Sequence, residues 1–265
     1  MSYLRFILLG CILACSLIAG AESRSDSIKV LFIGNSYTHY HDMYKMVAEI
    51  ASHVGQDQKA KVACEAYTPG GCTFKRHLQN RDAIDAIKRG DWDYVVLQEQ
   101  SSLPAMPTDS VAKNVYPYAG MLVDLVAEYN PDANVIFYMT WGHKYGCQSR
   151  HEGYPVIDTY EGMQDRLMLS YLEMAYSNDA RCAPVGMAWR RVRSERPYVS
   201  LYWPDCSHPS KVGSYLAANV IYTTIFSRPY QCSYFAGLDS ELAEYLQQIA
   251  QTTVFDNLRL LNISE

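Results

Sequence analysis

The fold of this chain is decided by residues 30–37, which read VLFIGNSY. Apolar side chains fill five of the six positions in residues 28–33, a pattern that predicts a buried strand. Gly34 permits a tight turn, and an amphipathic stretch follows at about residues 41–53. Ser36 is therefore expected where a strand meets the N-terminus of a helix. The unpaired backbone N–H groups at such a terminus favour the negative charge that develops during acyl transfer.

A second segment, residues 205–209 with the sequence DCSHP, supplies the rest of a nucleophilic site. A serine hydroxyl is a poor nucleophile until a hydrogen-bonded base takes its proton. An aspartate three residues before a histidine, on one tight turn, can reach the other imidazole nitrogen and orient the ring. Ser36, His208 and Asp205 are thus the candidate nucleophile, base and orienting carboxylate.

Apolar runs alternate with helical patterns along the chain. Strands are expected at 28–33, 61–67, 94–98, 135–139 and 183–187, and helices near 41–53, 74–89, 110–129, 158–177, 210–226 and 239–253. This alternation predicts an α/β fold, a three-layer α/β/α sandwich around a five-stranded parallel sheet. Ligand sites of such sheets gather at the carboxyl ends of the strands, so the segments that follow the strands should share one edge.

Composition limits the other possibilities. The 265 residues contain no linker or repeat, so we expect a single domain over residues 22–265. The content of 49% hydrophobic and 19% charged residues is typical of a protein with a large core. The net charge of −5, without a basic stripe, argues against a nucleic-acid partner.

Residues 1–21 are expected to be a signal peptide. Arg5 precedes an almost wholly apolar run at 6–18, and Ala19-Gly20-Ala21 suits cleavage before Glu22. The run is shorter than the roughly 20 residues that cross a bilayer, so no stable membrane span is expected. We expect an exported protein. The alternative is a lipoprotein acylated at Cys15.

Three groups of residues resemble sequence blocks of the SGNH hydrolases, also called GDSL-like esterases. They are Gly34-Asn35-Ser36, Gly71, and Asp205 with His208 and Pro209; residues 210–218 also resemble the segment that follows the family's histidine. The resemblance covers about residues 28–226. It implies the flavodoxin-like form of the α/β sandwich, and ester hydrolysis through an acyl-enzyme without metal or organic cofactor.

The resemblance also implies an oxyanion hole, formed by the backbone N–H groups of Ser36 and Gly71 and by a side-chain amide. The third block departs from the family, because residues 98–101 read QEQS where Gly-x-Asn-Asp is usual. Gln100 falls on the asparagine position, and its amide is an equivalent donor on a longer arm. Gln98 is the rival for this role. The alternative for this block is that Glu99 is a buried acid with a raised pKa.

Aromatic residues adjoin these motifs, and flat rings beside polar groups suit sugars as well as acyl chains. Tyr37, Trp141, His143 and Trp203 are the candidate substrate contacts; the alternative is that the aromatic residues belong to the core or the rim. The loop at 142–154 is the expected specificity element. The resulting hypothesis is a carbohydrate O-acetylesterase acting on a small-molecule or glycan ester. Two alternatives are a lipase or thioesterase for longer acyl chains, and a glycan-binding protein with vestigial catalytic residues.

Histidines and cysteines raise two further questions. His39 and His41 lack a clear third and fourth ligand, so no metal site is expected.

Six cysteines remain after removal of the leader, and an oxidising compartment favours disulfides. Positions along the strands suggest the pairs Cys147–Cys206 and Cys182–Cys232, with Cys64 and Cys72 left over. Buried reduced thiols are the alternative.

Overall fold

A computed structural model describes residues 27–147 and 153–263. Five parallel strands form one sheet in the order β2-β1-β3-β4-β5. Their bounds are β1 Ser27–Ile33, β2 Lys61–Tyr67, β3 Tyr94–Leu97, β4 Asn134–Tyr138 and β5 Arg181–Ala183. The predicted α/β/α sandwich is confirmed.

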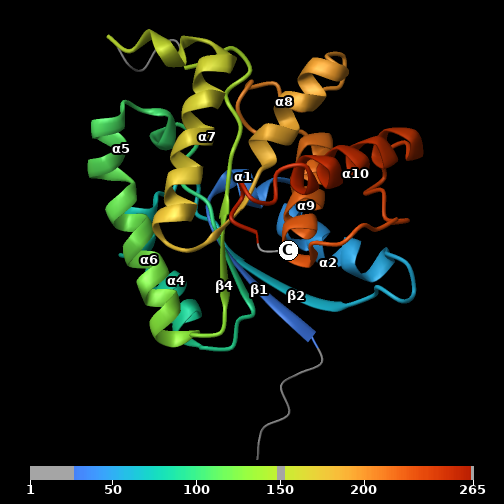
Figure 1. Cartoon of the computed structure of the whole chain (residues 1–265), viewed down its shortest axis with the longest axis horizontal. Coiled ribbons are helices and arrows are strands. Elements are labelled where there is room, and N and C mark those ends of the chain that lie inside the picture. The colour runs from blue at the N-terminus through green and yellow to red at the C-terminus, as the bar shows by residue number, and fades with distance from the viewer. Residues whose placement is uncertain (1–26, 148–152, 264–265) are drawn as a thin grey trace, which may run out of the picture.

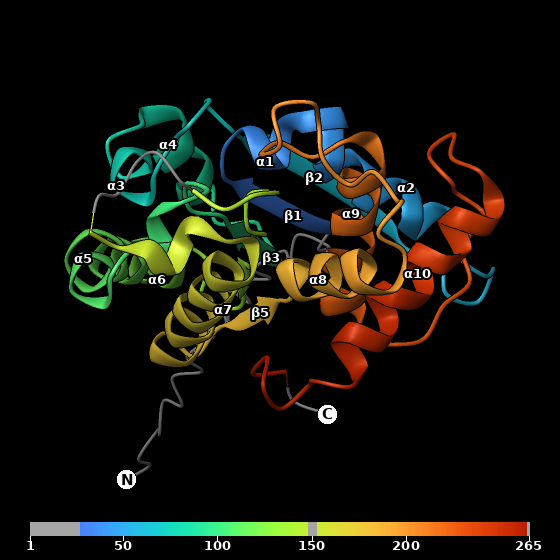
Figure 2. The ribbon, with the colours of Figure 1, turned by 90° about the horizontal axis from the view of Figure 1, so that it is seen from above.

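Helices cover both faces of the sheet, in two layers that Figures 1 and 2 separate clearly. One layer contains α3 Phe74–His77, α4 Arg81–Lys88, α5 Thr108–Asn114, α6 Tyr116–Tyr129 and α7 Tyr160–Ser177. The other contains α2 Met43–His53, α8 Val185–Glu195, α9 Lys211–Phe226 and α10 Ser240–Phe255. The short helix α1 Ser36–His39 follows β1.

The strand order reverses direction between β1 and β3, because β1 connects to β2 on one side and lies against β3 on the other. In open parallel sheets, ligands bind in the crevice at the carboxyl ends of the strands that flank this switch point. Backbone hydrogen bonds continue the pairing past the strand ends, from Gly34 N to Tyr67 O at 3.1 Å and from Gln98 N to Ile33 O at 2.9 Å. The segments after β1, β2 and β3 therefore start from one fixed edge.

Helix α9 is the centre of its layer. Every residue from Gly213 to Ile225 is buried, which fits a helix that is apolar on all sides. It packs against β5, α2, α8 and α10. Because α9 begins two residues after Pro209, this packing anchors the segment that carries His208.

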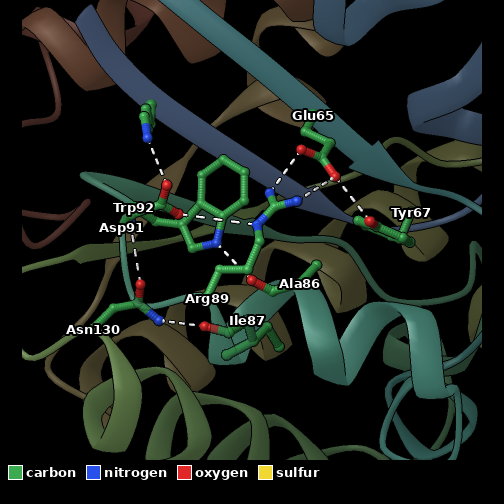
Figure 3. A network of polar contacts seen from close by, with 9 residues as sticks. Glu65, Tyr67, Ala86, Ile87, Arg89, Asp91, Trp92 and Asn130 are labelled. Carbon is green, nitrogen blue, oxygen red and sulfur yellow. Dashed lines mark hydrogen bonds and ion pairs between the residues drawn. The ribbon is translucent and has the colours of Figure 1, made fainter. Parts of the chain in front are cut away.

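A polar network holds the opposite, amino-terminal end of β3 (Figure 3). Arg89 donates two hydrogen bonds to the Glu65 carboxylate, at 3.0 and 2.7 Å. The buried Asn130 amide accepts from Trp92 N at 3.2 Å and donates to Ile87 O at 2.7 Å. These contacts fix the connection from α4 to β3.

Four of the five strands are confirmed within a residue. The fifth is wrong: β5 ends at Ala183, and the residues expected to continue it form the start of α8. Pro184 stops the strand pairing because it has no N–H to donate. The buried residues of α8, among them Val185, Ala188, Trp189 and Val192, recur at helical spacing, a signal that the expected strand obscured.

Two predicted helices are each split in the structure. The expected helix 74–89 is α3 and α4, and the Asn80 side chain caps the second by accepting from Asp82 N. The expected helix 110–129 is α5 and α6, separated where Pro117 occupies the first turn of α6 and cannot extend the α5 hydrogen bonds.

The leader predicted at residues 1–21, with its alternative acylation site at Cys15, lies outside the described residues. Among residues 27–147 and 153–263, no helix combines the length and apolar character required to span a bilayer.

Candidate active site

Ser36 is the first residue of α1, directly after the turn that leaves β1. The Asn35 side chain caps this helix by accepting a hydrogen bond from Tyr37 N at 3.1 Å. Only glycine fits at position 34, because a Cβ there would lie 2.7 Å from Thr38 Oγ1 and 2.8 Å from Gln98 Oε1. The expected strand–turn–helix setting of Ser36 is therefore present.

Asp205 and His208 lie on one tight turn that holds itself together. Asp205 Oδ1 accepts from Ser207 N at 3.0 Å and from His208 N at 2.9 Å, while Oδ2 accepts from His208 Nδ1 at 2.6 Å. Cys206 has a φ of +63°, a left-handed conformation that closes the turn. Most of the geometry of this pair is thus local.

The three predicted catalytic side chains meet in a line. Ser36 Oγ lies 2.9 Å from His208 Nε2, and the carboxylate on the other ring nitrogen leaves Nε2 as the acceptor. Partial burial would raise the pKa of Asp205, but hydrogen bonds from Ser207 and His208 outweigh it and hold that pKa below its usual value. Tyr40 stacks on the His208 ring at 4.4 Å, so the imidazole is supported on one face.

Gln100 lines the same cleft as Ser36 and Gly71. Its Oε1 accepts from Ser102 N at 2.9 Å and from Leu103 N at 3.0 Å. These backbone groups can only donate, so the amide orientation is determined and Nε2 is the atom left as a donor. One of its hydrogens reaches Ser101 Oγ at 3.2 Å, and no described residue accepts the second, which can therefore be donated to a ligand.

Gln98, the alternative candidate for the oxyanion amide, is buried, and its side chain already forms hydrogen bonds within the protein. Its Oε1 accepts from Asn35 N at 3.0 Å and from Thr38 Oγ1 at 2.9 Å, and its amide donates to Glu99 O. Gln98 therefore supports the turn before Ser36 and does not line the cleft.

Glu99 is a buried acid with a raised pKa, as one interpretation of the sequence proposed. Its side chain is completely buried, and burial raises its pKa to about 7 against the opposing effect of hydrogen bonds from Gln100 N and Phe74 N.

His77 is a second buried group that sequence reasoning missed. Its Nε2 lies 2.7 Å from Gly34 O, and burial chiefly lowers its pKa. No sequence spacing connects His77 with Ser36.

The cleft has a volume of about 450 Å³. Among the described residues, small or polar side chains line it together with Tyr37: Asn35, Ser36, Gly71, Gln100, Ser101, His143, Gly146, Cys147, Asp205, Ser207 and His208. Tyr37 and His143 both line the cleft, although Tyr37 is only 2% exposed, and their role as substrate contacts stays a prediction. The specificity loop predicted at 142–154 contributes His143, Gly146 and Cys147, and its residues 148–152 lie outside the described part.

The expected substrate contact at Trp141 is wrong. Trp141 is completely buried, stacked between Tyr37 at 4.6 Å and Trp189 at 3.8 Å with nearly parallel rings. Its Nε1 donates to Ser207 O at 3.0 Å, so it supports the turn that carries His208. Trp203 is 47% exposed and lies beside the cleft, with its ring 6.3 Å from Tyr40 and 5.9 Å from His41.

None of the six cysteines in the described residues forms a disulfide. Cys182 lies in β5 at one edge of the sheet, whereas Cys232 Sγ contacts Ile50 O of α2, which packs at the β2 edge. The predicted pairing took account of position along the strands and overlooked this separation across them. Cys147 and Cys206 lie on segments that meet, since Lys144 N donates to Cys206 O at 2.8 Å, but their sulfurs are not bonded.

Within the part of the chain that the structure describes, no group of three or more His, Cys, Asp or Glu side chains is arranged to hold a metal ion. His39 is exposed, and His41 faces the rings of Tyr40 and Trp203.

Comparison with family models finds no match, and comparison with curated proteins finds none either. Solved structures do match. A candidate SGNH hydrolase from Slackia heliotrinireducens is 27% identical with a TM-score of 0.58, over 75% of this chain and 99% of the other. A DUF4886 family protein from Bacteroides uniformis is 21% identical with a TM-score of 0.67, over 87% and 95%. An acetylxylan esterase from Geobacillus stearothermophilus is 20% identical with a TM-score of 0.53, over 75% and 94%.

Proposed function

We infer, from the premise that this chain belongs to the SGNH hydrolase superfamily, that it is a serine esterase that works through an acyl-enzyme. The observation that carries this proposal is the line of hydrogen bonds from Ser36 Oγ to His208 at 2.9 Å and from His208 to Asp205 at 2.6 Å. A nucleophile, a base and an orienting carboxylate in this order are the requirements of acyl transfer.

Each step uses a named group. His208 Nε2 takes the Ser36 proton as Oγ attacks the ester carbon, and Asp205 stabilises the imidazolium that forms. The oxyanion of the tetrahedral intermediate accepts hydrogen bonds from the backbone N–H groups of Ser36 and Gly71 and from the Gln100 amide. The imidazolium then protonates the departing alcohol. Water, deprotonated by His208, releases the acid and restores Ser36.

The lining of the cleft favours a short acyl group. None of its described residues is a large aliphatic side chain that would form an apolar slot for a long chain. Next to His208 lies an aromatic ledge, which consists of Tyr40, His41 and Trp203. A ring face that is half exposed beside polar groups suits a sugar, so we propose a carbohydrate O-acetylesterase. The fold similarity to an acetylxylan esterase supports this class.

A leader at residues 1–21 would direct this activity out of the cytoplasm. We therefore propose export as part of the function. Mass determination of the mature N-terminus tests it, with cleavage before Glu22 as the expected result and acylation at Cys15 as the opposing one.

Labelling with a fluorophosphonate probe tests the nucleophile. We expect the wild type to be labelled and Ser36→Ala to be unlabelled, because the probe phosphonylates an activated serine. Ser101→Ala is the matched control, since it removes another serine of the same cleft and should remain labelled. A wild type that binds oligosaccharide without labelling would support the glycan-binding alternative.

Acetate release from acetylated xylo-oligosaccharides, with 4-nitrophenyl acetate and octanoate for comparison, tests the substrate class. Trp203→Ala should raise KM for the oligosaccharide by about three- to tenfold, the loss of one stacking contact, and leave hydrolysis of 4-nitrophenyl acetate unchanged. Tyr198→Ala, at an exposed ring that does not line the cleft, should change neither. Preference for the octanoate ester would favour a lipase.

A further inference from the structure

Glu99 connects the two loops that carry the proposed oxyanion donors. Its carboxylate accepts from Phe74 N with both oxygens at 3.1 Å, and Oε1 also accepts from Gln100 N at 2.6 Å. Phe74 begins α3, three residues after Gly71. One buried carboxylate therefore spans the gap between the Gly71 loop and the Gln100 loop.

The backbone of Glu99 adds the third segment of the site. Its carbonyl oxygen accepts from Asn35 Nδ2 at 3.4 Å, and the same Asn35 amide group donates to Cys72 O at 3.1 Å. Glu99 N donates to the Tyr171 hydroxyl of α7 at 3.2 Å. The turn of Ser36, the Gly71 loop and the Gln100 loop are thus joined around a single residue.

This arrangement is unusual for a buried acid. The described partners of the carboxylate are backbone N–H groups, and its facing titratable groups are Tyr171 of α7 and Cys72 of the Gly71 loop, neither of which is a cation. A buried carboxylate without a cation costs stability. An apolar side chain would avoid that cost but would accept from neither loop, and an amide would keep one oxygen for the two N–H groups and replace the other by an NH₂ group that can only donate.

We propose that Glu99 is a positioning residue that holds the Gly71 and Gln100 loops at the separation required for oxyanion binding. This inference rests on the proposed function for the meaning of that separation. The ionised carboxylate accepts from both loops. Protonation places a hydrogen on one oxygen and weakens the connection, so activity should fall as Glu99 is protonated, in addition to the fall caused by protonation of the general base.

Glu99→Gln is the test variant, because it keeps the shape but turns an NH₂ group toward one of the two N–H donors. Amide hydrogen exchange should become at least about tenfold faster at whichever of Phe74 and Gln100 faces the new NH₂ group, because that connection is lost. With 4-nitrophenyl acetate, kcat should fall by about 10- to 100-fold while KM stays within about twofold. Glu99→Asp should recover part of kcat.

Asn130→Ala is the matched control, since it removes another buried, doubly bonded side chain at the far end of the sheet (Figure 3). It should lower stability without a selective change at Phe74 and Gln100.

The pH profile of kcat/KM is a second test. On its acid side, kcat/KM of the wild type should fall more steeply with decreasing pH than protonation of a single group allows. In Glu99→Gln the fall should match the protonation of a single group.

The two proposals fail differently. An inactive, unlabelled wild type would refute the esterase, yet the exchange comparison would still decide whether Glu99 holds the loops. Unchanged exchange at both residues would overturn the role of Glu99. Acceleration spread evenly over the sheet would overturn it as well, because it would show a contribution to global stability only.

Discussion

The two halves of the proposed active site are built in opposite ways. The acid–base half is an exposed turn of four residues, in which Asp205 holds His208 and both side chains remain in contact with solvent. The oxyanion half is supported by three buried residues, Asn35, Glu99 and Phe74, which join segments 25 to 64 residues apart. The first half is a local motif and the second is a product of the fold. Damage to the first should therefore affect chemistry alone, and damage to the second should affect chemistry and stability together.

The largest effect is expected from Asp205→Asn, which tests the local half. The amide can still accept from the backbone of the turn, but it no longer fixes the tautomer of His208, so kcat should fall by about 10⁴-fold. Steady-state hydrolysis of 4-nitrophenyl acetate measures this, and the melting temperature should stay near that of the wild type. A large loss of stability with little loss of kcat would reverse the comparison.

Gln100→Ala tests the donor that departs from the family pattern. Loss of one side-chain donor to the oxyanion should lower kcat by about 10²- to 10³-fold. Gln100→Asn, with the family's side chain, should retain more activity, and Gln79→Ala on a neighbouring loop should have no effect. Equal rates for Gln100→Ala and the wild type would remove Gln100 from the oxyanion hole.

Glu99 should leave a signature in the pH dependence of stability. Its pKa is raised from 4.5 to about 7 by burial, so between these values the folded protein holds a proton that the unfolded chain releases. Stability from this group is therefore present at low pH and lost as pH rises through 7. The stability advantage of the wild type over Glu99→Gln should shrink by about 2–3 kcal/mol between pH 5 and pH 8. Chemical denaturation at both pH values measures it, and a constant difference would contradict it.

The smallest effect distinguishes two neighbouring glycines in the oxyanion half. Gly71 has a φ of +60°, whereas Gly70 is outside the left-handed region, and a Cβ added at either position would meet no atom within 4 Å. Gly71→Ala should therefore cost about 1–2 kcal/mol through backbone strain alone and also lower kcat. Gly70→Ala should be close to neutral. Equal melting temperatures for the two variants would show that the loop tolerates the strain.

The same contrast explains what the sequence could predict. Ser36, Asp205 and His208 were predictable because each lies in a short motif whose neighbours determine its setting, such as the strand and Gly34 before Ser36. Four strands were predictable because continuous apolar runs mark buried parallel strands. The fifth was misplaced because Ala183 is followed by residues whose apolar pattern fits a strand or a buried helix, and only Pro184 marks the boundary.

The buried support of the site was not predictable. Trp189 and His77 come from helices whose partners are set by packing, and nothing in their local sequence connects them with Trp141 or Gly34. Trp141 follows a strand end, which correctly predicted its region. Whether it would face the cleft or lie behind it depends on Trp189, a residue far later in the chain. The predicted pair Cys182–Cys232 was wrong for a similar reason, since lateral position in the sheet depends on strand order.

The stack of Trp189, Trp141 and Tyr37 has a practical consequence. Two indoles with parallel planes and ring centroids 3.8 Å apart interact electronically, and one of them is hydrogen-bonded to the backbone beside His208. Their absorption and circular dichroism in the near ultraviolet are a natural optical reporter for this part of the molecule. Loosening of the reactive turn could be followed by spectroscopy without any attached dye.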